Sequence, residues 1–380
     1  MNRVRWLFPF GIINIFLIEN LLKTYDIPFA NDKIRLICYS LLGAMSGLFI
    51  LYYLYQQKGI VNTKRVSFAV VIYYICTLAM LFMHSNITSE ILLLCSMVPF
   101  AFFISYYGFL NSNKTEEIIR VQCIIFVVVW LLFMYNKLFL HQAGAGKLNS
   151  VFYVVLLLPF ILSLDNQFWV KVLMGFMMVA VVFSMKRTAV VIVVLAVLAF
   201  LWFKDSHNRA RVVKIAVALL VMLLAIVVIQ NRIGIDIIGK FEAMSEDGGS
   251  GRAGMYSVLL GLVFDRSPFQ FLFGDGYYAV INIIGETAHN DFLEILFDFG
   301  LFGFILYLFI YFCLLKSFIS MKRLGYKYCA QFLVSIIIFG IMSMLSHVIM
   351  IPSYMMYICM FWGLILADFE QWRFKGDLPQ

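Results

Sequence analysis

Charged side chains are scarce in this chain of 380 residues, because only 13% are Asp, Glu, Lys or Arg whereas 63% are hydrophobic. The mean hydropathy of +0.94 leaves too little polar surface to coat a soluble globule. The apolar runs are about 16–24 residues long, which is the length that crosses a hydrocarbon core of roughly 30 Å as a helix. The composition therefore excludes a soluble domain and predicts an all-α polytopic membrane protein.

Motifs of several catalytic classes are also missing from the sequence. It has no glycine-rich nucleotide-binding loop, so the energy for any work must come from an ion gradient or a pre-activated substrate. The seven cysteines lie in or beside apolar runs and form neither a CxxC pair nor a cluster with histidine, so we expect no metal and no cofactor. The net charge of +8 is explained by topology and anionic head groups and requires no nucleic acid.

The apolar runs predict about twelve transmembrane helices. Nine fall within residues 1–230, a long polar loop occupies 231–290, and three more helices with a short tail occupy 291–380. The predicted spans are 6–22, 34–55, 66–83, 90–110, 118–139, 150–164, 168–184, 188–203, 212–230, 292–315, 330–347 and 353–368.

The distribution of basic residues predicts the orientation. If the amino terminus is cytoplasmic, 18 of the 29 Lys and Arg residues lie on the inner side, as the positive-inside rule favours. Both termini are then cytoplasmic. The loop 231–290, the turn at Lys186 and Arg187, and the segment 347–352 face outward.

The outward loop holds a flexible glycine-rich stretch, 245–251, that leads to Arg252. The apolar stretch 253–264 is too short to span a membrane and is flanked by charges, so we expect a helix that lies at the interface. Pro268 is expected to end this helix, and a glycine turn bordered by aromatic residues follows at 271–278. Arg266 is interpreted as a contact to head groups or solvent.

The next predicted helix begins beside a His-Asn pair. Thr287 or His289 is expected to cap it. Three acidic residues follow at spacings of three and four, which places them on one helical face. They are Asp291, Glu294 and Asp298.

The order of these motifs resembles the O-antigen ligase and polymerase superfamily, whose members are bacterial membrane glycosyltransferases. The resemblance covers roughly residues 180–310: the basic turn ending at Arg187, the Ser-Gly-Arg sequence ending at Arg252, the glycine turn at 272–276, the His289-Asn290 pair and the glycines at 300 and 303. It implies a GT-C-like fold in the bacterial cytoplasmic membrane, with an extracytoplasmic catalytic loop.

The resemblance further implies a donor glycan on an undecaprenyl-pyrophosphate carrier. The favoured reaction is polymerisation of oligosaccharide repeat units into O-antigen or capsular polysaccharide, with a lipid-linked glycan as acceptor, membrane lipids around the protein and a chain-length regulator as a further partner. The alternative is an O-antigen ligase that transfers the glycan to lipid A core. A more distant alternative is a transporter or flippase, although that class favours broken helices and charges within the spans.

The departing pyrophosphate requires fixed positive charge, so Arg187 and Arg252 are the expected anion-binding residues and Lys186 is expected to assist them. A different interpretation is that Arg187 reaches an interface and that Arg252 is a solvated loop charge.

The imidazole of His289 is the candidate general base toward the acceptor hydroxyl, because its ordinary pKa suits proton uptake near neutrality. Asn290 and Glu294 are expected to orient this imidazole or the sugar. Tyr277 and Tyr278 could stack on sugar rings, or belong to an interfacial aromatic belt. His347, near an outward end, could line the cavity, but the favoured interpretation is an interhelical histidine with satisfied hydrogen bonds.

Overall fold

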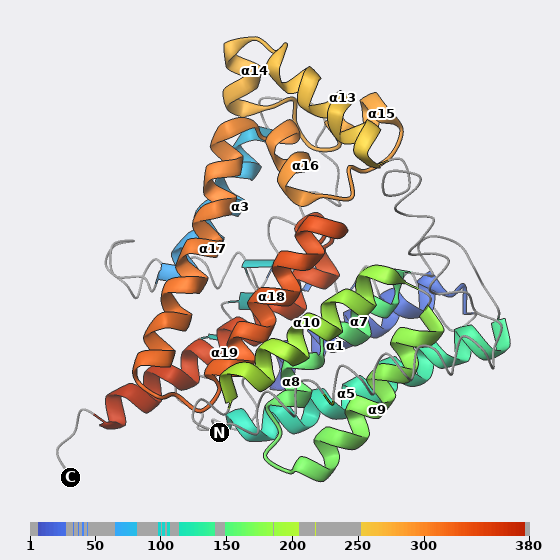
Figure 1. The fold of residues 1–380 in the computed structure, drawn as a ribbon, viewed down its shortest axis with the longest axis vertical. Coiled ribbons are helices and arrows are strands. Elements are labelled where there is room, and N and C mark those ends of the chain that lie inside the picture. The colour runs from blue at the N-terminus through green and yellow to red at the C-terminus, as the bar shows by residue number, and fades with distance from the viewer. Residues whose placement is uncertain are drawn as a thin grey trace.

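The computed structural model describes residues 7–27, 65–81, 114–140, 149–184, 186–204 and 252–376, together with single positions between 33 and 44, between 98 and 106, and at 217. Within these ranges the regular structure is helical and no strand occurs, which confirms an all-α protein (Figure 1). The helices are α1 (Leu7–Thr24), α3 (Arg65–Leu81), α5 (Thr115–Tyr135), α7 (Val151–Val155), α8 (Leu158–Leu162), α9 (Gln167–Ser184), α10 (Arg187–Lys204), α13 (Arg252–Phe264), α14 (Pro268–Phe273), α15 (Ala279–Ile284), α16 (Asp291–Asp298), α17 (Gly300–Arg323), α18 (Cys329–Leu345) and α19 (Pro352–Gly376).

Five helical segments in the described ranges are long and apolar enough to cross a membrane: α5 with the π-helical turn that follows it, α9, α10, α17 and α19. The predicted spans 118–139, 168–184, 188–203 and 353–368 coincide with four of them. The predicted spans 34–55, 90–110 and 212–230 fall largely outside the described residues, so the total of twelve stays a prediction.

Two predicted spans are interrupted. The span 150–164 consists of two short helices, α7 and α8, which are separated at Leu156 and Leu157, and Pro159 occupies the first turn of the second one. The predicted span 292–315 overlaps the candidate membrane span α17, but its bounds are wrong, because α16 ends at Asp298 and α17 runs from Gly300 to Arg323 as a separate helix.

A close approach of two backbone segments explains the break before α17. Gly274 and Gly300 both have positive φ angles, of 73° and 64°. A Cβ atom on Gly300 would lie 2.5 Å from the backbone of Leu272, and one on Gly274 would lie 2.2 Å from the carbonyl oxygen of Asp298. Only glycine fits at either position, so the glycine turn and the helix break form one joint.

Pro268 begins a helix instead of ending one. α13 already ends at Phe264, and Ser267 caps α14 through a capping box with Gln270, which leaves Pro268 in the first turn. The prediction failed because proline is favoured at a helix start as well as beyond a helix end.

The helices α13, α14 and α15 gather around α16 near the beginning of α17 (Figure 1). An apolar cluster that includes Leu259, Val280 and Phe297 holds α13, α15 and α16 together. The opposite side of α13 leaves Phe264 77% exposed. Elsewhere, α10 packs along α18 and α17 packs along α3. This packing brings the beginning of α13 and the segment before α16 to one end of α18.

Candidate functional site

Basic residues from separate helix ends meet at the end of α18. Arg252, the first residue of α13, donates a hydrogen bond of 3.0 Å from its guanidinium Nη1 to the carbonyl oxygen of Leu345 in the last turn of α18. Its charge acts on Lys186, which lies in the turn before α10 beside Arg187. The structure thus brings Lys186, Arg187 and Arg252 into one region, although they are up to 66 positions apart in the sequence.

Two imidazole rings face each other within this region. The rings of His289 and His347 are stacked, with centroids 5.3 Å apart and planes inclined by 19°. His347 follows α18, and its buried Nδ1 atom has no hydrogen-bond partner among the described residues. The interpretation of His347 as a satisfied interhelical histidine is therefore wrong. No sequence motif marks His347, and only the polar interruption between two apolar runs could have drawn attention to it.

The charges around the imidazoles keep them neutral. Burial lowers the pKa of His289, the positive charges of Arg252 and Lys186 lower it further, and Glu286 opposes them. Burial, His289, Lys186 and Arg252 lower the pKa of His347 to about 4. Burial and then the charges of Arg252 and Arg187 also lower the pKa of Lys186. The region therefore has an excess of positive charge that favours an anion.

The backbone of His289 is held in an uncommon conformation. Its φ angle is 51°, in the left-handed region that non-glycine residues seldom adopt. On one side, the side chain of Asn290 caps α16 by accepting hydrogen bonds from the N–H groups of Phe292 and Leu293 at 3.0 and 3.3 Å. The cap is thus Asn290 and not Thr287 or His289 as predicted. The hydrogen bonds of the adjacent Asn290 fix the direction in which the imidazole of His289 leaves the backbone.

Glu294 lies beneath this turn. It is 1% exposed and accepts a hydrogen bond from the backbone of Ala288. Burial and then the nearby carboxyls of Asp298 and Asp291 raise its pKa to about 9, so the side chain is a neutral carboxylic acid at pH 7. Its burial leaves it no direct contact with a sugar in this conformation, and the residue it contacts, Ala288, directly precedes His289 in the chain.

Asp291 connects the two histidine segments. Its carboxyl accepts hydrogen bonds from the backbone N–H groups of Val348 and Ile349 at 3.1 and 3.2 Å, and a further one from the hydroxyl of Tyr307. Because His347 directly precedes these two N–H groups, Asp291 positions it relative to His289. Burial raises the pKa of Asp291 to about 7, although its donors oppose that effect.

Asp298 also binds backbone N–H groups, at the start of α15. It is fully buried and accepts hydrogen bonds from the backbone N–H groups of Tyr278 and Val280 at 3.0 and 3.3 Å. Burial raises its pKa to about 8. The three acids share one buried face, as their spacing predicted, and two of them hold backbone turns.

Three further residues of the predicted loop make contacts with other parts of the protein. Tyr277 is 3% exposed and packs edge-on against Phe299 at 4.6 Å, so it belongs to the core and offers no face to a sugar. Tyr278 is half-buried beside it. Arg266 was expected to contact head groups, and this is wrong. It pairs with Asp275, donates to the carbonyl oxygen of Phe297 at 2.8 Å and lies over the Phe297 ring.

The described residues contain no group of three His, Cys, Asp or Glu side chains that could hold a metal ion. What the site offers is positive charge together with two neutral imidazoles. An anion held by the cations would lie beside a group that can accept a proton.

The fold and the site define a helical membrane protein in which basic residues and two stacked imidazole rings meet at one end of α18. Residues 172–308 match the family model for the O-antigen ligase domain, and this match supports the resemblance to the O-antigen ligase and polymerase superfamily of glycosyltransferase-like membrane enzymes. The matched residues include Lys186, Arg187, Arg252 and His289, whereas His347 lies beyond them. No curated protein matches the chain.

Proposed function

We propose that this protein transfers a glycan from a polyprenyl-pyrophosphate carrier to an acceptor hydroxyl at the outer face of the bacterial cytoplasmic membrane. The observation that carries the proposal is the meeting of Arg252 and Lys186 with the stacked pair of His289 and His347. The family match supports lipid-linked glycans as substrates. In this proposal the turn at Lys186 and the segment at His347 face outward, and both termini are cytoplasmic.

The cations stabilise the leaving group. As the bond between the anomeric carbon and the pyrophosphate oxygen breaks, the electron pair and negative charge pass to the lipid pyrophosphate. Arg252 uses one guanidinium N–H for the Leu345 carbonyl, which fixes the orientation of the planar group. Its other N–H groups can bind phosphate oxygens in a bidentate manner, with Arg187 and Lys186 adding charge.

His289 accepts the proton. The acceptor hydroxyl oxygen forms the new bond to the anomeric carbon, and its proton moves to the neutral imidazole. Because the pKa of His289 is lowered, the base is present at neutral pH. The positive charge that the imidazole gains then lies beside the departing pyrophosphate anion. Attraction to this anion offsets the repulsion between the imidazolium ion and the neighbouring cations.

Two acceptors are compatible with this chemistry. A polymerase would transfer the growing chain to a second lipid-linked repeat unit, as the sequence interpretation favours. A ligase would transfer it to lipid A core, and the match to the O-antigen ligase domain is compatible with both acceptors.

Purified full-length protein in liposomes would be supplied with lipid-linked repeat units, with and without lipid A core. A ladder of longer glycans without core supports the polymerase, whereas a product that requires core supports the ligase. Arg252→Ala and His289→Ala should each abolish most product, and Arg323→Ala, at the far end of α17, should not. Movement of the lipid-linked glycan across the membrane without any covalent product would overturn the proposal in favour of a flippase.

A further inference from the structure

A cavity lies far from the histidines. It has a volume of about 690 Å³ and is lined by the first turns of α5, by the loop before α9 and by the beginning of α9. Lys186 follows the opposite end of α9, so the length of a membrane-spanning helix separates this cavity from the candidate glycosyl-transfer site. The cavity therefore lies outside the candidate glycosyl-transfer site.

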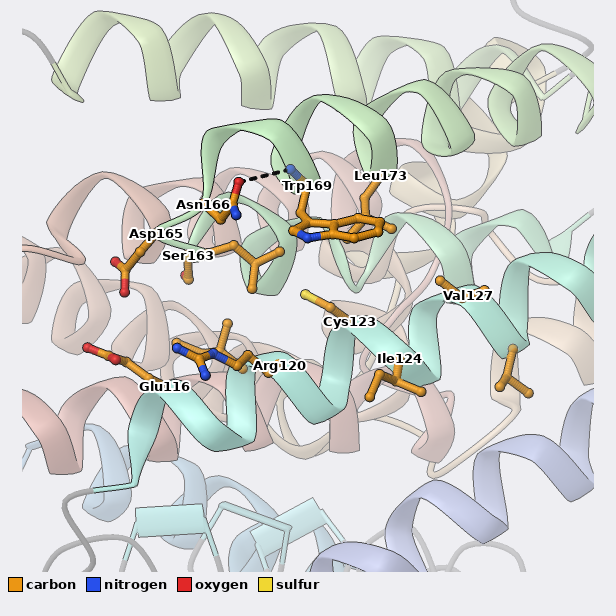
Figure 2. Close-up of a pocket in the computed structure, with 13 residues that line it drawn as sticks. Glu116, Arg120, Cys123, Ile124, Val127, Ser163, Asp165, Asn166, Trp169 and Leu173 are labelled. Atoms are coloured by element: carbon orange, nitrogen blue, oxygen red, sulfur yellow. Dashed lines mark hydrogen bonds between the residues drawn. The ribbon is translucent and has the colours of Figure 1, made fainter.

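The cavity has a charged end and an apolar end. Figure 2 shows Glu116, Arg120 and Asp165 gathered at one end, and the side chains of Ile124 and Val127 continuing along α5 away from them. Trp169 borders the cavity and is 53% exposed, as is typical of aromatic residues at the level of lipid head groups. Since α5 and α9 are both candidate membrane spans, the apolar end points into the hydrocarbon region.

The three charged residues at the charged end of the cavity form no ion pair with one another. Glu116 forms an ion pair with Lys327 at 3.1 Å, so its charge is compensated within the protein. In the described part of the chain, Arg120 forms no hydrogen bond or ion pair, and Asp165 forms none either. One guanidinium and one carboxylate thus face the same space without contacting each other.

We propose that this cavity binds phosphatidylethanolamine. Its phosphate would lie on Arg120, because a guanidinium matches phosphate geometry. Its ammonium group would lie toward Asp165, and an acyl chain would fill the apolar end beside Val127 and Leu173. An anionic phospholipid that lacks an amine would satisfy Arg120 but leave the carboxylate of Asp165 without a positively charged partner.

Native mass spectrometry of the purified full-length protein tests this assignment. The protein would be mixed in detergent with equal amounts of phosphatidylethanolamine and phosphatidylglycerol that carry the same acyl chains. We expect the wild type to retain phosphatidylethanolamine with a preference of about fivefold, the effect of one partly exposed ion pair. Asp165→Asn should remove the preference while leaving lipid bound, and Arg120→Gln should weaken retention of both lipids.

Two further variants separate the head group from the chain. Val127→Phe should reduce binding of both lipids by filling the apolar end, whereas Lys171→Gln removes a charge from an exposed position on α9 outside the cavity and should change nothing. A wild type that retains both lipids equally, or a preference that survives Asp165→Asn, would overturn the proposal. Stronger retention of a polyprenyl phosphate than of phosphatidylethanolamine would assign the cavity to the carrier lipid and would overturn it too.

Discussion

The rings of His289 and His347 lie 5.3 Å apart and nearly parallel, although 58 positions separate them in the sequence. Two imidazolium ions cannot share such a place with Arg252 and Lys186 nearby, so at most one of the two rings is in the positively charged imidazolium form at a time. Asp291 fixes this arrangement, because it belongs to the helix that follows His289 and binds the two backbone N–H groups that follow His347.

The pH dependence of transfer should reflect the neutral form of His289. Protonation removes the base, so kcat/KM should fall as the pH decreases through a value below 6.5, the ordinary pKa of histidine. Lys186→Met removes one of the charges that lower this pKa and should move the acidic limb to higher pH. A pH profile of the initial transfer rate checks this shift, and a limb that stays in place would argue against His289 as the titrating group.

His347 should act by positioning the imidazole of His289, on which its ring is stacked, more than through direct contact with the substrate. His347→Phe keeps a stacked ring but removes both nitrogens, and we expect a loss of about tenfold in kcat with little change in KM. His289→Phe should cost about 10²–10⁴ in kcat, the usual contribution of a general base. Equal losses in the two variants would contradict this division of roles, and kinetics with a fixed lipid-linked donor would measure it.

Arg252 should be more than a positive charge. Arg252→Ala should lower kcat by about 10²–10³, the cost of removing a preorganised contact to developing charge. Arg252→Lys keeps the charge but loses the planar fork that binds Leu345 and phosphate together, so it should recover less than half of the lost activation free energy. Full recovery with lysine would mean that charge alone suffices.

Much of this architecture could be predicted from hydropathy, because a span needs only length and apolar composition. The spans that became α5, α9, α10 and α19 have the expected positions. The helix break at Gly300 could not be predicted, since an unbroken apolar run conceals it. It depends on the backbone of Leu272, which approaches from an earlier segment.

The candidate site was predictable to a similar extent. Arg252 and His289 stand in recognisable short motifs, and the structure brings them into one electrostatic environment. Arg266 and His347 were misinterpreted because their surroundings come from distant parts of the chain. The ring beneath Arg266 belongs to Phe297, and the ring beside His347 belongs to His289.

Glu294 should make stability depend on pH. Its pKa is raised from 4.5 to about 9 in the folded protein, so it favours folding fully only below about pH 4.5, and that contribution is lost as the pH rises toward 9. The loss amounts to about 1 kcal/mol per pH unit for this group. Glu294→Gln retains the shape without the proton, so its melting temperature should fall less between pH 5 and pH 8.5 than that of the wild type. Parallel curves in a thermal unfolding assay would contradict the raised pKa.

The joint between the glycine turn and α17 should tolerate no side chain. Gly300→Ala would place a methyl group 2.5 Å from the backbone of Leu272 at a φ angle of 64°, so either the turn or the helix must move. Strain of this kind costs roughly 1–3 kcal/mol from the backbone angle alone, before any overlap is counted. Gly261→Ala is the matched control, because it lies within α13 with no atom within 4 Å of the added carbon and should be neutral or slightly stabilising.

If thermal unfolding in detergent gave the same melting temperature for both variants, the close contact of 272–274 with 298–300 would be refuted. If Gly300→Ala lowered the melting temperature and also reduced transfer, the loss of activity would follow from displacement of α16, which positions both histidine segments through Asp291 and Asn290.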